Sequence, residues 1–155
     1  MAKVSHLVAY DDDHYAWVLE QIALLEAARF SDLDIAHLTD ELKYLANMTK
    51  REIENRLTVL LQHLLKWQFQ PDRRSNGWRA TIIEQRRRIN AELTDSPSLR
   101  RYPAIVMEEE YVVARLRAAD ETGLPVKRFP STCPYSAGEA LDERFWPGGG
   151  GDFEQ

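Results

Sequence analysis

Apolar residues recur along this chain with the 3.6-residue spacing of an α-helix, and this pattern divides most of the sequence into helices. The first is expected from about residue 12 to 28 and the third from about 76 to 94. The second runs from a cap among Ser31, Asp32 and Asp34 to about residue 69, and the fourth covers about 103 to 121. No stretch alternates as a strand does. The pattern therefore predicts an all-α protein, an antiparallel bundle of about four helices with the second the longest.

The second helix carries the longest apolar stripe, which runs without Gly or Pro until Pro71 stops it. The stripe consists of Leu38, Leu42, Leu45, Thr49, Ile53, Leu57, Leu60, Leu64 and Trp67. Pro97 and Gly123 end the next two helices, and a capping-box pattern at 136–139 predicts a short C-terminal helix. We expect residues 1–147 to form a single domain and residues 148–155 a flexible Gly-rich tail.

Length and composition fit one globular domain, because 155 residues with 44% apolar and 29% charged content suffice for a single core. Cys133 is the sole cysteine, so no disulfide can form within the chain. The N-terminus lacks the features of a signal peptide, and no segment has the roughly 20 apolar residues that span a bilayer. We therefore expect a cytoplasmic protein that does not interact with membranes.

Charge is distributed unevenly along the sequence. Residues 1–49 and 102–155 are acidic, with net charges of −6 and −5, whereas residues 50–101 have a net charge of +6. A basic segment can indicate an acidic partner such as nucleic acid. The alternative is neutralisation within the fold, because antiparallel packing of the third and fourth helices sets Arg86 near Glu109. Arg86 shares the stripe of Trp78 and Ile82, so we expect it to be buried in an ion pair with Glu109.

The segment from residue 63 to 79 is the strongest candidate for a site, because two helices meet there at a polar turn that carries arginines between two tryptophans. Four of its residues share one face of the second helix at spacings of i, i+3, i+4 and i+7. The candidate ligand or partner surface consists of His63, Lys66, Trp67, Gln70, Arg73, Arg74, Ser75, Trp78 and Arg79. We call this set the turn cluster.

The turn cluster has two interpretations. In the first, Trp67 and Trp78 form a stacking platform and the basic side chains contact phosphates, as in proteins that hold single-stranded nucleic acid or nucleotides. In the second, the indoles fill the end of the bundle and the polar groups bond to carbonyls at the helix ends. We favour the second interpretation, with Arg73 and Arg74 the residues expected to face an outside partner.

Catalytic, metal and cofactor sites are not expected. Asp11 and His14, and Asp34 and His37, have the i, i+3 spacing of paired ligands, but antiparallel folding about residue 31 sets the two pairs at different heights. His63 faces lysine and arginine, which disfavours a general base. Cys133 is interpreted as a small buried hydrophobe.

Several separate strings resemble the bacterial family called domain of unknown function 29. They are His-Leu-Leu-Lys-Trp-Gln-Phe-Gln-Pro over 63–71, Ser75-x-x-Trp78-x-x-x-Ile82-x-x-x-Arg86, Pro97-Ser98-Leu99, Tyr10-Asp11 with Trp17 and Leu19-Glu20-Gln21, and the ending Phe129-Pro130, Cys133-Pro134 and Phe145-Trp146-Pro147. The resemblance covers roughly residues 10 to 147. It implies an all-helical cytoplasmic domain and implies no activity or catalytic residues.

Three hypotheses about function follow. The first, which we favour, is a non-enzymatic binding or regulatory module that engages a protein partner or self-associates through a helix face. The second is a nucleic-acid or nucleotide binder that uses the turn cluster. The third is a hydrolase that uses His63, which would need a carboxylate beside that histidine.

Overall fold

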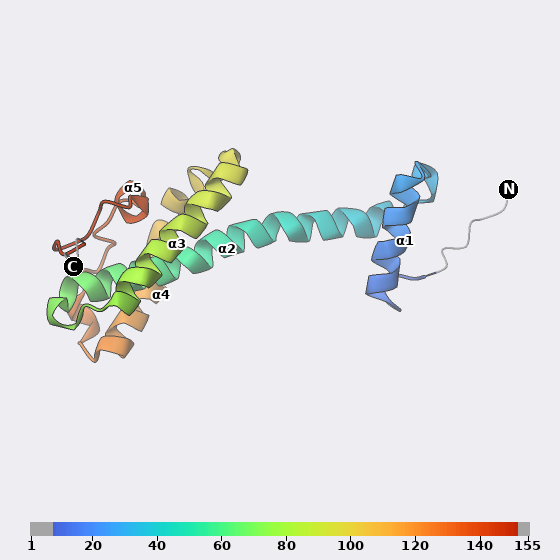
Figure 1. The fold of residues 1–155 in the computed structure, drawn as a ribbon. Helices are drawn as coiled ribbons and strands as arrows, with labels where there is room; N and C mark the ends of the chain where they lie inside the picture. Colours follow the sequence, from blue (N-terminus) through green and yellow to red (C-terminus); the bar gives the residue numbers. More distant parts are fainter. Residues whose placement is uncertain (1–7, 152–155) are drawn as a thin grey trace. The chain divides into compact units, whose positions relative to one another are not determined.

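The computed structural model describes residues 8–151, and within this range the chain forms helices and no strand. The helices are α1 (His14–Glu26), α2 (Ile35–Phe69), α3 (Asn76–Asp95), α4 (Tyr102–Thr122) and α5 (Ala137–Leu141) (Figure 1). Single 3-10 turns lie at Phe30–Asp32, Pro71–Arg73, Pro97–Leu99 and Val126–Arg128. The predicted all-α class is confirmed, and α2 is the longest helix at 35 residues.

The helix ends lie where the sequence signals put them. Asp13 caps α1 by accepting a hydrogen bond from the backbone N–H of Ala16 at 3.0 Å. Ser75 caps α3, and Ser136 forms a complete capping box with Glu139 at α5. Gly123 ends α4 with a φ of +70°, a left-handed conformation that glycine adopts without strain. Local chemistry therefore sets the length of these helices.

The chain divides into two compact units, residues 1–48 and residues 49–155, which we call the N-terminal and C-terminal units. The N-terminal unit contains α1 and the start of α2. The C-terminal unit contains the rest of α2 and the helices α3, α4 and α5. Each unit has its own packing and is described separately.

The C-terminal unit holds the main hydrophobic core. The part of α2 after Thr49 supplies seven of its residues, α4 supplies six and α3 supplies three, and Phe129, Tyr135 and Ala140 complete it. Side chains with no exposed surface include Ile53, Leu57, Leu60, Leu61, Leu64, Leu65, Trp67, Ile82, Ile89, Ala114, Ala118 and Ala140. The segment after α4 packs onto this core through Phe129 and Tyr135, which are 1% and 5% exposed. The Tyr111 hydroxyl of α4 donates a hydrogen bond of 2.6 Å to the carbonyl of Pro130, which links that segment to α4.

The N-terminal unit buries much less. Within residues 8–48, Trp17, Gln21 and Leu24 on one side of α1 are buried. Asp34, just before α2, joins this small core because its carboxylate accepts a hydrogen bond from the Trp17 indole at 3.1 Å. Its backbone N–H donates to the Gln21 side chain at 2.8 Å. In Figure 1, α1 crosses the start of α2 steeply instead of lying antiparallel to it.

The first prediction concerns the core of the C-terminal unit. Leu57→Ala removes a side chain with no exposed surface and should lower the free energy of unfolding by about 2–5 kcal/mol, because it leaves a cavity. Leu116→Ala is the matched control, since Leu116 is 54% exposed and its loss should cost well under ~1 kcal/mol. Urea denaturation of both variants measures the difference. Equal midpoints would contradict the assigned core.

Candidate functional site

The turn cluster lies where the last turns of α2 lead through the 3-10 turn Pro71–Arg73 into α3. Trp67 is its centre and has no exposed surface. The Trp67 indole donates a hydrogen bond to the carbonyl of Gly149 at 2.9 Å, and its ring centroid lies 4.9 Å from that of Trp146. Both contacts come from the C-terminal end of the described chain. The faces of Trp67 are therefore covered and do not form an open stacking platform.

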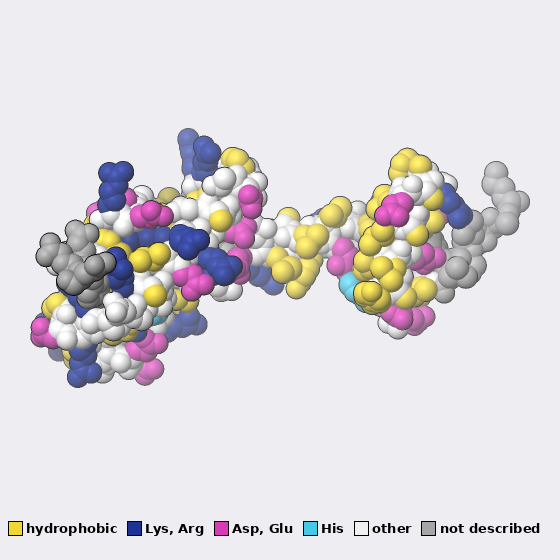
Figure 2. All heavy atoms as spheres, viewed as in Figure 1, with side chains coloured by type: hydrophobic (Ala, Val, Ile, Leu, Met, Phe, Trp, Pro, Cys, Tyr) yellow, Lys and Arg dark blue, Asp and Glu magenta, His cyan; other side chains and the backbone are white. Residues whose placement is uncertain are grey.

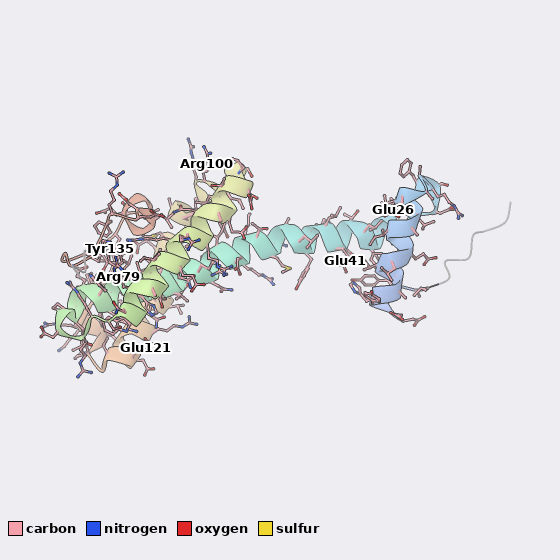
Figure 3. The ribbon with its side chains drawn as sticks, in the orientation of Figure 1. Glu26, Glu41, Arg79, Arg100, Glu121 and Tyr135 are labelled. Atoms are coloured by element: carbon pink, nitrogen blue, oxygen red, sulfur yellow. The ribbon has the colours of Figure 1, made fainter. Side chains whose placement is uncertain are left out.

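The basic residues beside Trp67 also have partners within the protein. Arg74 donates from Nε to the carbonyl of Trp67 at 2.9 Å, and its guanidinium lies 4.9 Å from the centre of that indole. We expected Arg74 to face outward, but it bonds to a carbonyl in the last turn of α2. Lys66 is 6% exposed, and its ammonium lies 2.6 Å from the carboxylate of Glu121 on α4 (Figure 3). The same ammonium lies 4.6 Å from the ring centre of Trp78.

The remaining members of the turn cluster range from half-buried to exposed. His63 is half-buried, and burial lowers its pKa. Its Nδ1 donates to the carbonyl of Val59 at 2.8 Å, and no hydrogen bond joins it to a carboxylate of the described residues. Gln70 and Trp78 are half-buried, and Ser75 caps α3. The side chain of Arg73 is exposed, as expected.

Arg86 is buried as expected, at 1% exposure, but the expected ion pair with Glu109 is absent. The guanidinium donates instead to two backbone carbonyls, from Nε to Ala140 at 2.7 Å and from Nη2 to Phe145 at 2.6 Å. The ion pair was expected from the packing of α3 on α4 alone. Residues 137–151 lie on the side of α3 that carries Arg86, so two of their carbonyls accept its hydrogen bonds in place of a carboxylate. Burial lowers the pKa of Arg86 to about 10, which leaves it charged at neutral pH.

Residues after α5 complete this end of the molecule, although residues 148–155 were expected to form a flexible tail. The carbonyl of Gly151 accepts a hydrogen bond from Nε of Arg79 at 3.1 Å (Figure 3). Gly150 has a φ of +82°, which favours glycine, and a Cβ atom there would lie 2.4 Å from Nη1 of Arg74, so the Arg74 side chain would have to move. The sequence feature that could have indicated this packing is the run of four glycines after Trp146 and Pro147, because glycines allow the backbone to approach other side chains closely. Residues 152–155 of the predicted tail lie outside the described residues.

A cavity of about 730 Å³ lies between α3 and this C-terminal segment. Four arginines line it, Arg79, Arg86 and Arg87 from α3 and Arg144 from the segment. The indole of Trp146 and the backbone of 149–151 form further parts of the wall, and Glu143 is the acidic residue among the lining side chains. The sequence did not predict this cavity, because its two walls are more than 50 residues apart in the chain.

The N-terminal unit contains a second polar cluster, which corrects another expectation. The pairs containing His14 and His37 were expected to lie at different heights, but Tyr10 and Glu41 join them. The carboxylate of Glu41 accepts a hydrogen bond from the Tyr10 hydroxyl at 2.6 Å and lies 2.8 Å from Nε2 of His14. The Tyr10 ring stacks on His37 with a centroid distance of 4.1 Å. The steep crossing of α1 over α2 brings these rings together, whereas antiparallel packing would separate them.

Hydrogen bonds set the charge state of the carboxylates in this cluster. Those from Tyr10 and then His14 hold the pKa of Glu41 below its ordinary value. Burial alone would raise the pKa of Asp34, but hydrogen bonds from His37 and Trp17 outweigh it and lower this pKa. The carboxylates therefore act as fixed acceptors that hold α1 on α2.

Among residues 8–151 no group of three His, Cys, Asp or Glu side chains is placed to hold a metal ion. The Cys133 thiol is half-buried and burial raises its pKa to about 11, so it is protonated at neutral pH. No helix in the same range is both long enough and apolar enough to cross a membrane.

Exposed apolar side chains are concentrated in the N-terminal unit (Figure 2). On α1, Tyr15, Leu19 and Ile22 are 74%, 49% and 44% exposed, and their spacing places them on one side of the helix. The start of α2 adds Leu42 and Leu45, at 65% and 57%. Further exposed members are Leu25, Phe30, Ile35, Tyr44 and Met48.

Comparison with known proteins places the chain in a family. The model of the family described as Domain of unknown function DUF29 matches residues 9–146, which is most of the chain. This protein is therefore a member of the DUF29 family, as the resemblance of its separate strings predicted. No curated protein and no solved structure matches it.

The second prediction tests the turn cluster. Trp67→Ala should lower the free energy of unfolding by about 3–5 kcal/mol, because the indole is fully buried. Trp78→Ala should cost less, since Trp78 is half-buried. Thermal melts of both variants check this order, and binding of a labelled single-stranded oligonucleotide is measured at two salt concentrations. A stable Trp67→Ala variant with weakened oligonucleotide binding would instead support the nucleic-acid hypothesis.

The third prediction concerns pH. Because the pKa values of Glu41 and Asp34 are lower in the folded protein than in the unfolded chain, their contribution to stability is complete above the ordinary pKa values and is lost as pH falls through the folded ones. Acidification below about pH 4.5 should therefore loosen the N-terminal unit. The indole N–H resonance of Trp17, which donates to Asp34, reports the loss.

Glu41→Gln is the variant for this titration, because the glutamine amide is neutral and is not protonated as the pH falls. It should weaken the dependence of the Trp17 resonance on pH, whereas Asp40→Asn, an exposed neighbour, should leave it unchanged. A resonance that stays constant to pH 3 in the unmodified protein would contradict the role given to these carboxylates.

Proposed function

We propose that this protein is a non-enzymatic binding module that self-associates through the apolar face of its N-terminal unit. This face is defined by Tyr15, Leu19 and Ile22 of α1 and Leu42 and Leu45 of α2. The partner at this face is a second copy of the same chain. We further propose that it acts in the cytoplasm.

The main support for the proposal is that the apolar stripe of α2 is buried along one part of the helix and exposed along the other. Ile53, Leu57 and Leu60 belong to this stripe and have no exposed surface, because α3 and α4 cover them. Leu42 and Leu45 continue the same stripe and are 65% and 57% exposed. A helix stripe that is apolar along its whole length is typical of a helix that is covered along its whole length. The uncovered part therefore indicates a missing partner.

The apolar arc of α1 supports the same conclusion. The small core of the N-terminal unit uses only the side of α1 that carries Trp17, Gln21 and Leu24. Tyr15, Leu19 and Ile22 lie on a different side, and nothing within residues 8–48 buries them. The apolar surface of α1 is thus wider than a single neighbouring helix can cover.

The exposed apolar surface is extensive for so small a unit. The five side chains of the face are 44% to 74% exposed, and Leu25, Phe30, Ile35, Tyr44 and Met48 of the same unit are exposed as well. An exposed apolar surface of this kind is typical of a site of protein association. The unit also encloses only a small core by itself, which consists of Trp17, Gln21 and Leu24. A second copy supplies an apolar surface of matching extent.

Charge determines how association should respond to salt. Residues 1–48 carry nine Asp and Glu but three Lys and Arg, so two copies that meet at this unit repel each other. Added salt screens the repulsion and leaves apolar burial in place. An attraction between the acidic unit of one copy and the basic segment 50–101 of another would instead weaken with salt.

The fourth prediction is that the protein forms dimers that strengthen between 50 mM and 500 mM NaCl. Sedimentation equilibrium at several protein concentrations measures the mass and the dissociation constant. Leu19→Glu and Leu42→Glu should each shift the equilibrium to monomers, because a carboxylate buried in an apolar interface lacks a partner. Ile105→Glu is the matched control, since Ile105 is 75% exposed on α4 and lies outside the N-terminal unit.

Three results would contradict the proposal. The first is a monomer at every concentration and salt level. The second is association that weakens with salt, and the third is equal disruption by Ile105→Glu. Circular dichroism of each variant confirms that it remains helical, so that loss of association is not mistaken for loss of fold.

A further inference from the structure

The geometry points to a binding site for a small polyanion in the cavity between α3 and the C-terminal segment, with arginine side chains that contact its phosphate or carboxylate oxygens. The site lies in the C-terminal unit and shares no residue with the apolar face. It is therefore independent of the proposed self-association.

The cavity walls carry an excess of positive charge. Arginines 79, 86, 87 and 144 line the cavity, and Glu143 is the acidic residue among its lining side chains. Arg87 and Arg144 are exposed, and neither forms an ion pair with a described carboxylate. Figure 2 shows Lys and Arg side chains gathered over the part of the molecule that holds α3. Closely spaced arginines repel one another, so an anion among them is stabilised.

Arg86 supplies an independent indication. Two of its guanidinium nitrogens donate to the carbonyls of Ala140 and Phe145, but the buried Nη1 has no hydrogen-bond partner. A buried donor without an acceptor costs about 1–3 kcal/mol. No carboxylate bonds to this side chain either, so its charge is not cancelled by direct contact. An anion in the cavity that Arg86 lines lies close to this side chain and compensates its charge.

The wall is arranged before a ligand arrives. Backbone carbonyls hold Arg86, and the carbonyl of Gly151 accepts from Nε of Arg79. The guanidinium of Arg86 also lies 5.3 Å from the centre of the Trp146 indole. Fixed arginines lose little side-chain entropy when they bind an oxyanion, which favours affinity.

The size of the cavity limits the ligand. A volume of about 730 Å³ lies within the range of roughly 300–1,000 Å³ that is typical of small-molecule sites. A single phosphate ion occupies a small part of that volume. The ring of Trp146 packs 4.9 Å from Trp67, so it offers no free platform for a stacked base. The site therefore fits a small molecule with several anionic groups better than a strand of nucleic acid.

The fifth prediction is tested by isothermal titration calorimetry of the full chain with inorganic triphosphate, and separately with citrate, at constant ionic strength. We expect one site per chain. Arg87→Gln and Arg144→Gln should each weaken binding about tenfold, because each removes a charge-assisted hydrogen bond. Binding of triphosphate alone identifies phosphate as the recognised group, and binding of citrate identifies carboxylate. Arg117→Gln, an exposed arginine of α4 outside the cavity, should leave the affinity unchanged.

These variants avoid the buried Arg86, whose loss can unfold the protein, and thermal melts verify that each remains folded. Absence of binding to both anions overturns the proposal, and so does equal weakening by Arg117→Gln. A chain that ends at Gly151 provides a last check. Binding that occurs only after removal of residues 152–155 would show that the chain fills its own cavity, which also overturns a site for an external ligand.

Discussion

The structure depends on one constraint, that the apolar stripe of α2 must be covered. Within the C-terminal unit α3 and α4 meet this requirement, and Ile53, Leu57 and Leu60 lose all contact with water. At roughly 25 cal/mol per Å², such burial is the main favourable term in folding. Within the N-terminal unit the same requirement is unmet at Leu42 and Leu45. The contrast along one helix explains why one unit has a packed core and the other leaves apolar side chains exposed.

The end of the bundle shows how buried polar groups are satisfied without acidic partners. Arg74 and Arg86 use backbone carbonyls as acceptors, and so does the indole of Trp67. Carbonyls in the last turn of a helix, such as those of Trp67 and Ala140, and carbonyls outside helices, such as that of Gly149, are available because they lack intrahelical partners. The C-terminal segment thus has a structural role that its glycine-rich composition conceals. It closes the core over Trp67 and also forms a wall of the arginine-lined cavity.

The basic middle of the sequence is used in two ways. Lys66 pairs with Glu121, and Arg56 pairs with Glu52 one helical turn away, so part of the charge is neutralised within the fold. Arg87 and Arg144 remain unpaired among the described residues and face the same cavity. Membership of the DUF29 family places the chain among its relatives and assigns no reaction.

The sequence by itself determined the elements of this protein. Periodicity, Pro71, Ser75 and Gly123 specify helix identity and ends because each acts over a few residues. It also indicated that Arg86 is buried, since that residue shares a stripe with Ile82. Only the tertiary structure decided what Arg86 contacts, where α1 crosses α2, and that residues 137–151 form a cavity wall with α3. Such contacts join segments distant in the chain, and their geometry depends on packing angles that periodicity does not encode.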